Sequence, residues 1–262
     1  MTKILLVGCG KMGSAMLAGW LDRGMAAADM VVVEPSGAEL PVTVVPDAAA
    51  IPAGFAPDVV VLAVKPQVMA QVLPAYARFG EAVFLSIAAG KTIPFFETHL
   101  GDAAAVVRAM PNTPAAVRRG IAVCCANPRV DRGRRALCQD LLEAVGEVAW
   151  LEDESLMDAV TAVSGSGPAY VFLLAEVMAA AGAAQGLPPD LATRLARATV
   201  SGSGELLRQS SEAAEQLRRN VTSPGGTTAA ALTVLMDEAA GMAPLMEKAV
   251  AAATRRGKEL AG

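Results

Sequence analysis

Several features are absent from this 262-residue sequence, and each absence excludes a class of protein. It has no block of basic residues and no stripe of aromatic and basic side chains, which argues against a nucleic-acid partner. The longest uncharged run, 159–175, is interrupted by Ser-Gly-Ser-Gly-Pro, so we do not interpret it as a membrane span. The first apolar run is broken by glycine too early for a signal peptide. We therefore expect a cytoplasmic protein that binds neither nucleic acid nor a membrane.

Cysteine is scarce, and its spacing does not suit a metal site. Cys9, Cys124, Cys125 and Cys138 form no paired ligand pattern, and two of them are adjacent in an apolar stretch. We expect small buried thiols in a reducing compartment and no metal centre.

Short apolar, β-branched runs alternate with helical patterns in the first half of the sequence. Strands are predicted at 3–7, 30–34, 58–64, 82–88, 104–110, 120–126 and 147–151. Helices are predicted at 11–23, from Pro66 onward and at about 131–145. Near-continuous apolar strands that alternate with helices favour a parallel sheet covered on both faces.

The second half of the sequence has helical patterns only. Breaks are expected at 164–168, 186–190, 223–226 and 241–244, where glycine and proline cluster. Between Ala159 and Thr193 only Glu176 and Asp190 are charged, so these helices should be buried between intertwined subunits. We predict an α/β Rossmann-type dinucleotide-binding domain over 1–156 and an all-α dimerisation domain over 157–262.

A glycine-rich turn follows the first predicted strand. Gly8, Gly10 and Gly13 have the G-x-G-x-x-G spacing and open a helix, and Glu34 ends the second strand. Gly8 would permit the tight turn, Gly10 the close approach of a pyrophosphate, and Gly13 the packing of helix on strand. Glu34 would bond a ribose hydroxyl, which argues for NADH, and no arginine lies between Arg23 and Arg78 to hold a 2′-phosphate. Ser36 is a weak phosphate partner, so NADPH and NADH both stay open.

Three further segments follow predicted parallel strands, and ligands bind beyond the carboxyl ends of such strands. They are 63–67, 86–90 and 110–114, and each alone is also explained as a turn with a helix cap. The candidate cofactor-binding residues are Gly8, Gly10, Lys11, Met12, Gly13, Glu34, Pro35, Ser36, Val64, Lys65, Pro66, Ala88, Ala89, Gly90, Met110, Pro111 and Asn112.

The usual proton donors of a carbonyl reductase are largely missing. The single histidine, His99, belongs to the first domain, and no lysine lies between Lys91 and Lys248. Lys65 is the one plausible exception. A hydride enzyme without a strong acid in its second domain suits a substrate that is already activated, such as a protonated C=N bond, whose reduction yields a neutral amine.

The stretch Asn-Val-Thr-Ser-Pro-Gly-Gly-Thr-Thr, 220–228, is a polar break among helices. Gly225 and Gly226 leave N–H groups free before a helix, and Ser223, Thr227 and Thr228 add hydroxyls, which suits a bound carboxylate. A simple loop with an N-cap explains the same residues, so by itself the stretch does not decide between a connector and a site.

These segments together resemble the pyrroline-5-carboxylate reductase family over nearly the whole chain. The resemblance is carried by 7–16, 63–67, 86–90, 108–114, 162–172 and 220–232, in the family's order. It implies reduction of (S)-1-pyrroline-5-carboxylate to L-proline by NADPH or NADH, and domain-swapped dimers that often join into decamers.

The resemblance also implies roles for single residues. Substrate-binding residues would be Asn220, Val221, Ser223, Gly225, Gly226 and Thr227, of which Ser223 and the loop's backbone hold the carboxylate, while Thr228 would hydrogen-bond the imine nitrogen. This sequence departs from the family at Arg219, where an acidic residue is frequent, and at 210–216, which lacks a common proline.

Two other functions fit parts of the pattern. A two-domain hydroxyacid dehydrogenase would use Lys65 as its proton donor. A dinucleotide-sensing regulator would bind the cofactor without turnover, but it leaves the 223–228 stretch unexplained.

Overall fold

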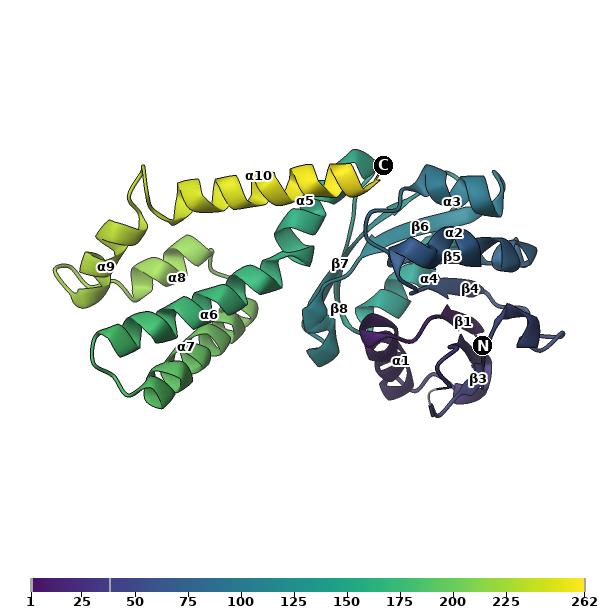
Figure 1. The fold of residues 1–262 in the computed structure, drawn as a ribbon, viewed down its shortest axis with the longest axis horizontal. Helices are drawn as coiled ribbons and strands as arrows, with labels where there is room; N and C mark the ends of the chain where they lie inside the picture. Colours follow the sequence, from purple (N-terminus) through teal and green to yellow (C-terminus); the bar gives the residue numbers. More distant parts are fainter. Residues whose placement is uncertain (1, 38, 262) are drawn as a thin grey trace. The chain divides into compact units, whose positions relative to one another are not determined.

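The computed structural model describes residues 2–37 and 39–261 and divides into two compact units (Figure 1). The sheet unit extends to Gly165 and includes the chain's last segment from Ala253, and the helical unit comprises Ser166–Ala252. The sequence placed the boundary after Leu156. The structure places it nine residues later, because Met157 and Ala162 are fully buried in the sheet unit, at 0% and 1% exposure.

The sheet unit contains one eight-stranded sheet in the order β3-β2-β1-β4-β5-β6-β7-β8. Its strands are β1 Ile4–Val7, β2 Met30–Val33, β3 Thr43–Val45, β4 Val59–Leu62, β5 Val83–Ser86, β6 Ala105–Met110, β7 Gly120–Ala126 and β8 Gly146–Trp150. The seven predicted strands are confirmed within two residues at each end. The short edge strand β3 was not predicted, because three residues with an exposed Thr43 give no clear pattern.

The prediction of a wholly parallel sheet is wrong for its last two strands. Strands β1 to β6 are parallel, whereas β7 pairs antiparallel with β6 through Val107 opposite Ala126. The segment between β6 and β7 holds only a 3₁₀ turn, η5, at Thr113–Val117. A parallel crossover needs a dozen or more residues, so the short connection forces β7 to return antiparallel, and β8 follows it in parallel.

Helices cover both faces of the sheet, as predicted (Figure 1). One face carries α1 Lys11–Asp22 and α4 Arg132–Glu143, whose Trp20 and Leu141 belong to the same core and share a hydrogen bond of 2.9 Å. The other face carries α2 Met69–Val72, the 3₁₀ helix η4 Leu73–Phe79 and α3 Ile93–Leu100, with Phe84 and Phe96 fully buried. The apolar strands pack between the two helical layers and form the core of the unit. This packing holds the strands, and therefore their carboxyl ends, in place.

Three of the four cysteines lie in this core. Cys124, Cys125 and Cys138 are buried, and Cys9 is half-buried in the glycine turn. Burial raises the pKa of the Cys138 thiol to about 12, so it stays protonated and unreactive. The expectation of small buried thiols is confirmed for these three.

The expected helix break at 164–168 is a π-helical turn instead. Short helix α5, Met157–Val160, continues into a π turn at Thr161–Gly165, and α6 follows at Gly167. Thr161 Oγ1 donates to the Met157 carbonyl at 2.8 Å, and Ser164 Oγ donates to the Val160 carbonyl at 3.0 Å. These side chains satisfy carbonyls that the wider turn disturbs, so glycine and serine here widen a helix without ending it.

The helical unit has little core of its own. Its helices are α6 Gly167–Ala184, α7 Pro189–Gln209, α8 Ala214–Asn220, α9 Thr227–Leu235 and α10 Met242–Ala261, the last of which ends in the sheet unit. Among its described residues, Ala192 and Ala196 are the only buried hydrophobic side chains, while Phe172 is 67% exposed. The continuous helix Glu154–Ala184 is long and apolar enough to cross a membrane by length and composition, and its most apolar window has no buried residue. A folded monomer would therefore leave a large apolar surface in water.

Candidate functional site

The carboxyl ends of the parallel strands meet along one edge of the sheet. Val7 lies opposite both Val33 and Leu62, Leu62 lies opposite Ser86, and Ser86 lies opposite Arg108. Every predicted cofactor-binding segment of the sheet unit begins at or just beyond one of these strand ends. The strand order reverses at β1, which has β2 on one side and β4 on the other, and such a switch point is where open parallel sheets bind ligands.

The glycine turn after β1 has the shape that a dinucleotide requires. Gly8 has φ +89°, and a Cβ on it would meet Val64 Cγ1 at 2.9 Å. A Cβ on Gly13 would meet the Gly8 carbonyl oxygen at 2.6 Å, so α1 packs directly on the turn. A Cβ on Gly10, in contrast, would have no neighbour within 4 Å. The first and third glycines are required by packing, whereas the second faces open space in which a pyrophosphate fits.

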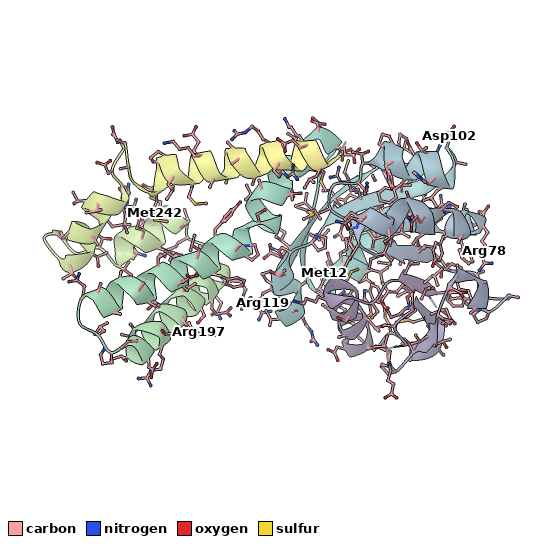
Figure 2. The ribbon with its side chains drawn as sticks, in the orientation of Figure 1. Met12, Arg78, Asp102, Arg119, Arg197 and Met242 are labelled. Carbon is pink, nitrogen blue, oxygen red and sulfur yellow. The ribbon has the colours of Figure 1, made fainter. Side chains whose placement is uncertain are left out.

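The first turn of α1 adds an anion-binding feature. Gly10 is its N-cap residue and no side chain caps the helix, which begins at Lys11 and has Met12, labelled in Figure 2, as its second residue. Uncapped N–H groups and the positive end of the helix dipole both favour a phosphate at this position. The turn therefore fits the nucleotide that the sequence motif predicts.

Glu34 lies next to this turn and is held by two backbone donors. Its Oε2 accepts a hydrogen bond from the Cys9 N–H at 2.8 Å, and its Oε1 accepts one from the Ser36 N–H at 3.1 Å. These bonds, the Cys9 N–H first, lower the pKa of the Glu34 carboxyl against the opposing effect of burial. Burial and the Glu34 charge together raise the pKa of the Cys9 thiol. The site thus presents an ionised, positioned carboxylate beside the glycine turn.

The segments after β4 and β5 lie at the same edge. Lys65 is exposed and precedes Pro66, which begins the 3₁₀ helix η3 at Pro66–Val68. The turn after β5 is held by Ser86, whose Oγ accepts a hydrogen bond from the Ala88 N–H at 3.2 Å. Ala88 is buried, Ala89 is exposed and Gly90 has φ +69°. Backbone, more than side chains, is therefore what this turn offers to a ligand.

The Asn112 side chain connects two segments of the sheet unit by hydrogen bonds. Its Oδ1 accepts a hydrogen bond from the Ile121 N–H at 2.9 Å, and its Nδ2 donates to the Ser164 carbonyl at 3.1 Å. Both ends of the amide are thus engaged by the protein, at the antiparallel turn and at the π-helical turn. Met110 and Pro111, just before it, are half-buried and buried. The structure gives Asn112 a positioning role that spacing alone did not indicate.

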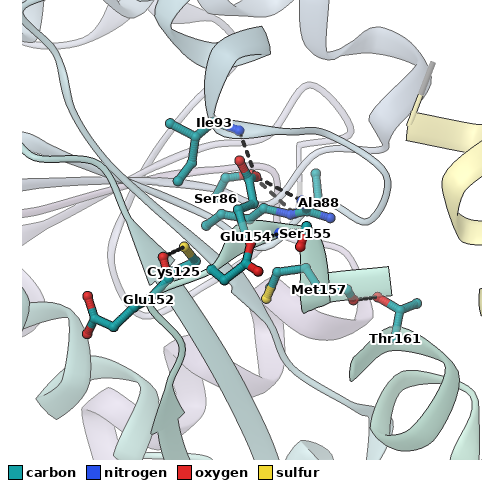
Figure 3. Close-up of polar contacts among 11 residues, drawn as sticks. Ser86, Ala88, Ile93, Cys125, Glu152, Glu154, Ser155, Met157 and Thr161 are labelled. Atoms are coloured by element: carbon teal, nitrogen blue, oxygen red, sulfur yellow. Dashed lines mark hydrogen bonds and ion pairs between the residues drawn. The ribbon is translucent and has the colours of Figure 1, made fainter. Parts of the chain in front are cut away.

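A buried ion pair supports two of these segments, and sequence reasoning missed it. Arg108 Nη1 donates to Glu154 Oε1 at 2.8 Å, with the Arg108 side chain 5% exposed and that of Glu154 22% exposed. The same oxygen accepts from the Ile93 N–H at 2.8 Å, at the start of α3, and Figure 3 shows Glu154 and Ile93. A charged residue in the apolar run 104–110 was the one available signal, since a buried arginine needs a partner.

The 220–228 stretch, in the helical unit, ends at the start of a helix. Gly226 is the N-cap residue of α9 and no side chain caps it, while Gly225 has φ +72°. The Gly226 N–H donates to the Ser223 carbonyl at 3.1 Å, which closes a tight turn before the helix. Ser223 and Thr227 are exposed and Thr228 is half-buried. An uncapped helix N-terminus with three nearby hydroxyls can receive a carboxylate.

Two polar residues before this turn bond to side chains of α8 or of the segment just before it. Asn220 Nδ2 donates to Glu212 Oε2 at 3.1 Å, and its Oδ1 accepts from Gln216 Nε2 at 2.8 Å. Arg219 forms an ion pair with Glu215 at 2.6 Å, one turn earlier on α8. The positive charge that distinguishes this stretch is therefore compensated within α8, and the Asn220 side chain stabilises the approach to the turn.

Comparisons with known proteins cover both units. Residues 154–260 match the family model described as pyrroline-5-carboxylate reductase dimerisation, and residues 3–90 match one described as NADP oxidoreductase, coenzyme F420-dependent. The pyrroline-5-carboxylate reductase of Pseudomonas aeruginosa is 41% identical over 99% of this chain and 97% of that protein.

Solved structures agree with this relationship. A pyrroline-5-carboxylate reductase from Coxiella burnetii superposes with a TM-score of 0.91 at 34% identity, covering 99% of this chain and 98% of the other. The Plasmodium falciparum pyrroline carboxylate reductase with NADP bound gives 0.85 at 30% identity, covering 100% and 98%. A glycine turn shaped for a dinucleotide, a helical dimerisation unit and chain-long similarity all agree, and the chain belongs to the pyrroline-5-carboxylate reductase family.

Proposed function

We propose that this protein reduces (S)-1-pyrroline-5-carboxylate to L-proline with NADPH or NADH, the last step of proline biosynthesis. The observation that carries the proposal is the similarity to the Pseudomonas aeruginosa enzyme over 99% of the chain, which includes the glycine turn and the 220–228 stretch. The nicotinamide, when bound, supplies a hydride. The protein's own residues have to hold two ligands, exclude water and provide a partner for the ring nitrogen.

The sheet unit is proposed to hold the dinucleotide. The uncapped first turn of α1 receives the pyrophosphate, with Gly10 leaving room for it. Glu34 accepts hydrogen bonds from the adenosine ribose. The turns at Val64–Pro66, Ala88–Gly90 and Met110–Asn112 line the rest of the edge, where Ser86 and Asn112 keep their backbones in position.

The helical unit is proposed to hold the substrate carboxylate at the N-terminus of α9. Its uncapped N–H groups and the Ser223 hydroxyl are donors, and the helix dipole favours the negative charge. Because the turn is closed by the bond from Gly226 to Ser223, little further ordering is needed when the carboxylate binds.

Thr228 is proposed as the partner of the ring nitrogen. A hydroxyl can accept a hydrogen bond from a protonated imine and donate one to the amine product, so it serves nitrogen in both states. Hydride addition to the iminium carbon neutralises its charge and produces no alkoxide. The site therefore needs no histidine or lysine acid in the helical unit, which has neither near this stretch.

The self-association of the dimerisation unit is proposed to give a dimer, and further a decamer, in the cytoplasm and without membrane attachment. The exposed apolar side chains of α6 support the dimer, because the unit's own core contains only small alanines among its described residues.

A kinetic comparison of substrates tests the reaction. The purified protein should oxidise NADH or NADPH steadily with pyrroline-5-carboxylate and should show no turnover with 2-oxo acids. Turnover of 2-oxo acids alone would contradict the proposal, as would cofactor binding without turnover of either substrate.

A further inference from the structure

Hydrogen bonds fix both the backbone and the carboxylate of Glu34. The backbone at this residue is fixed, because the Glu34 N–H donates to the Val45 carbonyl of β3 at 2.9 Å. Both carboxylate oxygens are also fixed, by the Cys9 N–H at 2.8 Å and the Ser36 N–H at 3.1 Å. The carboxylate therefore cannot swing away from the glycine turn without losing two hydrogen bonds.

The carboxylate still has capacity to bind a ligand. Each oxygen of an ionised carboxylate accepts about two hydrogen bonds, and each Glu34 oxygen accepts one from a backbone N–H group. The Ser36 side chain also bonds to the carboxylate, and the half-buried residue keeps part of its surface exposed. Its pKa is lowered, first by the Cys9 N–H, and the side chain is therefore charged at neutral pH.

The surrounding segment contains no compensating cation. From residue 24 to residue 64 the sequence has no lysine and no arginine, but it has five acidic residues: Asp29, Glu34, Glu39, Asp47 and Asp58. Arg78, labelled in Figure 2, donates to the Ala48 carbonyl at 2.7 Å and stacks on Phe79 at 4.8 Å. Within the described part of the chain, the groups that lower the Glu34 pKa are the Cys9 N–H first, then the Ser36 N–H and the Ser36 side chain, and none of them is a basic side chain.

We infer that Glu34 is the residue that selects the dinucleotide, and that this protein prefers NADH to NADPH. The inference rests on the dinucleotide site of the proposed function and adds which cofactor that site accepts. A carboxylate at the end of the second strand accepts hydrogen bonds from the ribose hydroxyls of NADH. In NADPH the 2′-hydroxyl is replaced by a phosphate, so a donor is lost and a dianion faces a fixed negative charge.

The preference for NADH comes from the segment after β2, and the fold as a whole does not impose it. The Plasmodium falciparum relative was solved with NADP bound at 30% identity, so a closely similar backbone accepts the 2′-phosphate. The segment after β2 in this chain, which begins at Glu34, has only acidic residues among its charged side chains up to Asp58.

Binding measurements on the purified, full-length protein test the inference without the substrate. Dissociation constants for NADH and NADPH are measured by titration calorimetry, with AMP and 2′-AMP as probes of the ribose position alone. We expect NADH to bind at least about tenfold more tightly than NADPH, and AMP to bind more tightly than 2′-AMP. Equal affinities, or tighter binding of NADPH, would overturn the inference.

Glu34→Gln and the matched variant Glu39→Gln distinguish two roles of Glu34: selecting the cofactor and supporting the glycine turn. Both remove one negative charge from the same loop, but only Glu34 contacts the glycine turn. We expect Glu34→Gln to reduce the NADH preference by roughly tenfold, chiefly through tighter NADPH binding, and Glu39→Gln to leave the ratio unchanged. If Glu34→Gln weakens both cofactors equally and keeps the ratio, Glu34 only supports the turn and the inference is wrong.

The outcome is distinguishable from a failure of the proposed reaction. Binding ratios do not depend on pyrroline-5-carboxylate, so a protein that prefers NADH but does not reduce the imine would contradict only the reaction. The ratio of kcat/KM for the two cofactors, measured with pyrroline-5-carboxylate, should follow the binding ratio in the wild type and both variants.

Discussion

Arg108 on β6 and Glu154 on the 3₁₀ turn η6, Glu154–Leu156, are joined by a buried ion pair of 2.8 Å that also holds the first N–H of α3. Arg108 precedes the Met110–Asn112 segment, and α3 follows the Ala88–Gly90 turn. One carboxylate oxygen therefore fixes two strand-end segments that we propose to line the cofactor site, although neither residue faces a ligand in the proposal.

Removing one partner of this pair should destabilise the fold. Glu154→Gln leaves the Arg108 guanidinium buried without a countercharge, so we expect the free energy of unfolding to fall by about 3 kcal/mol. Denaturant unfolding measures it. Glu152→Gln is the matched control, because Glu152 is 90% exposed and its pair with Arg135 should contribute less than about 1 kcal/mol. Equal losses in the two variants would refute a special role for the buried pair.

The second and third glycines of the turn should respond differently to alanine. Gly10→Ala places a methyl in open space, so the fold should be unchanged while dinucleotide affinity falls by roughly tenfold or more. Gly13→Ala places a methyl 2.6 Å from the Gly8 carbonyl oxygen and should lower stability by about 2 kcal/mol. Thermal unfolding and cofactor titration of both variants check this. Undiminished cofactor binding by Gly10→Ala would argue against a pyrophosphate at this position.

Thr228 should affect catalysis but not cofactor binding. Without its hydroxyl the ring nitrogen would lose the partner that we propose for it, so Thr228→Ala should lower kcat/KM by roughly ten- to a thousandfold, about 1.4–4 kcal/mol. Thr228→Ser keeps the hydroxyl and should recover most of the activity. Steady-state kinetics with pyrroline-5-carboxylate, together with NADH titration, measures both effects. Wild-type activity of Thr228→Ala would dismiss the role.

Charges on the apolar face of α6 should disrupt self-association. Val171 is 46% exposed and Leu174 is 38% exposed, so an aspartate at either position would be buried unpaired in a dimer interface. Sedimentation should then show monomer or unfolded protein. Val117→Asp, at a 69% exposed valine of the sheet unit, should leave the dimer intact. A wild type that is itself a stable monomer would contradict the prediction.

The sequence predicts those parts of the fold that short stretches of residues determine by themselves. The strands β1, β2 and β4 are buried on both sides, so continuous apolar runs marked them clearly. The predicted direction of β7 was wrong. Strand direction depends on the length of the connection and on the neighbouring strands, and the apolar sequence of β7 does not reveal either. The π-helical turn at Thr161–Gly165 was predicted as a break, since glycine and serine lower helix propensity in both cases.

The candidate site divides in the same way. Gly8, Gly10, Gly13 and Glu34 are recognisable because their spacing follows from one strand, one turn and one helix. Asn112, by contrast, forms hydrogen bonds with Ile121 and Ser164. No local sequence pattern predicts these partners.

The sequence by itself determined the two kinds of domain, the glycine turn, the missing proton donors and the family resemblance, because each depends on residue identity and short spacing. Tertiary structure alone decided that Glu34 is held by Cys9 and Ser36, that Arg108 has Glu154 as its partner, and that α6 keeps an exposed apolar face. Hydrogen bonds and burial between distant residues arise only when the strands are placed side by side, so they become visible only in the folded chain.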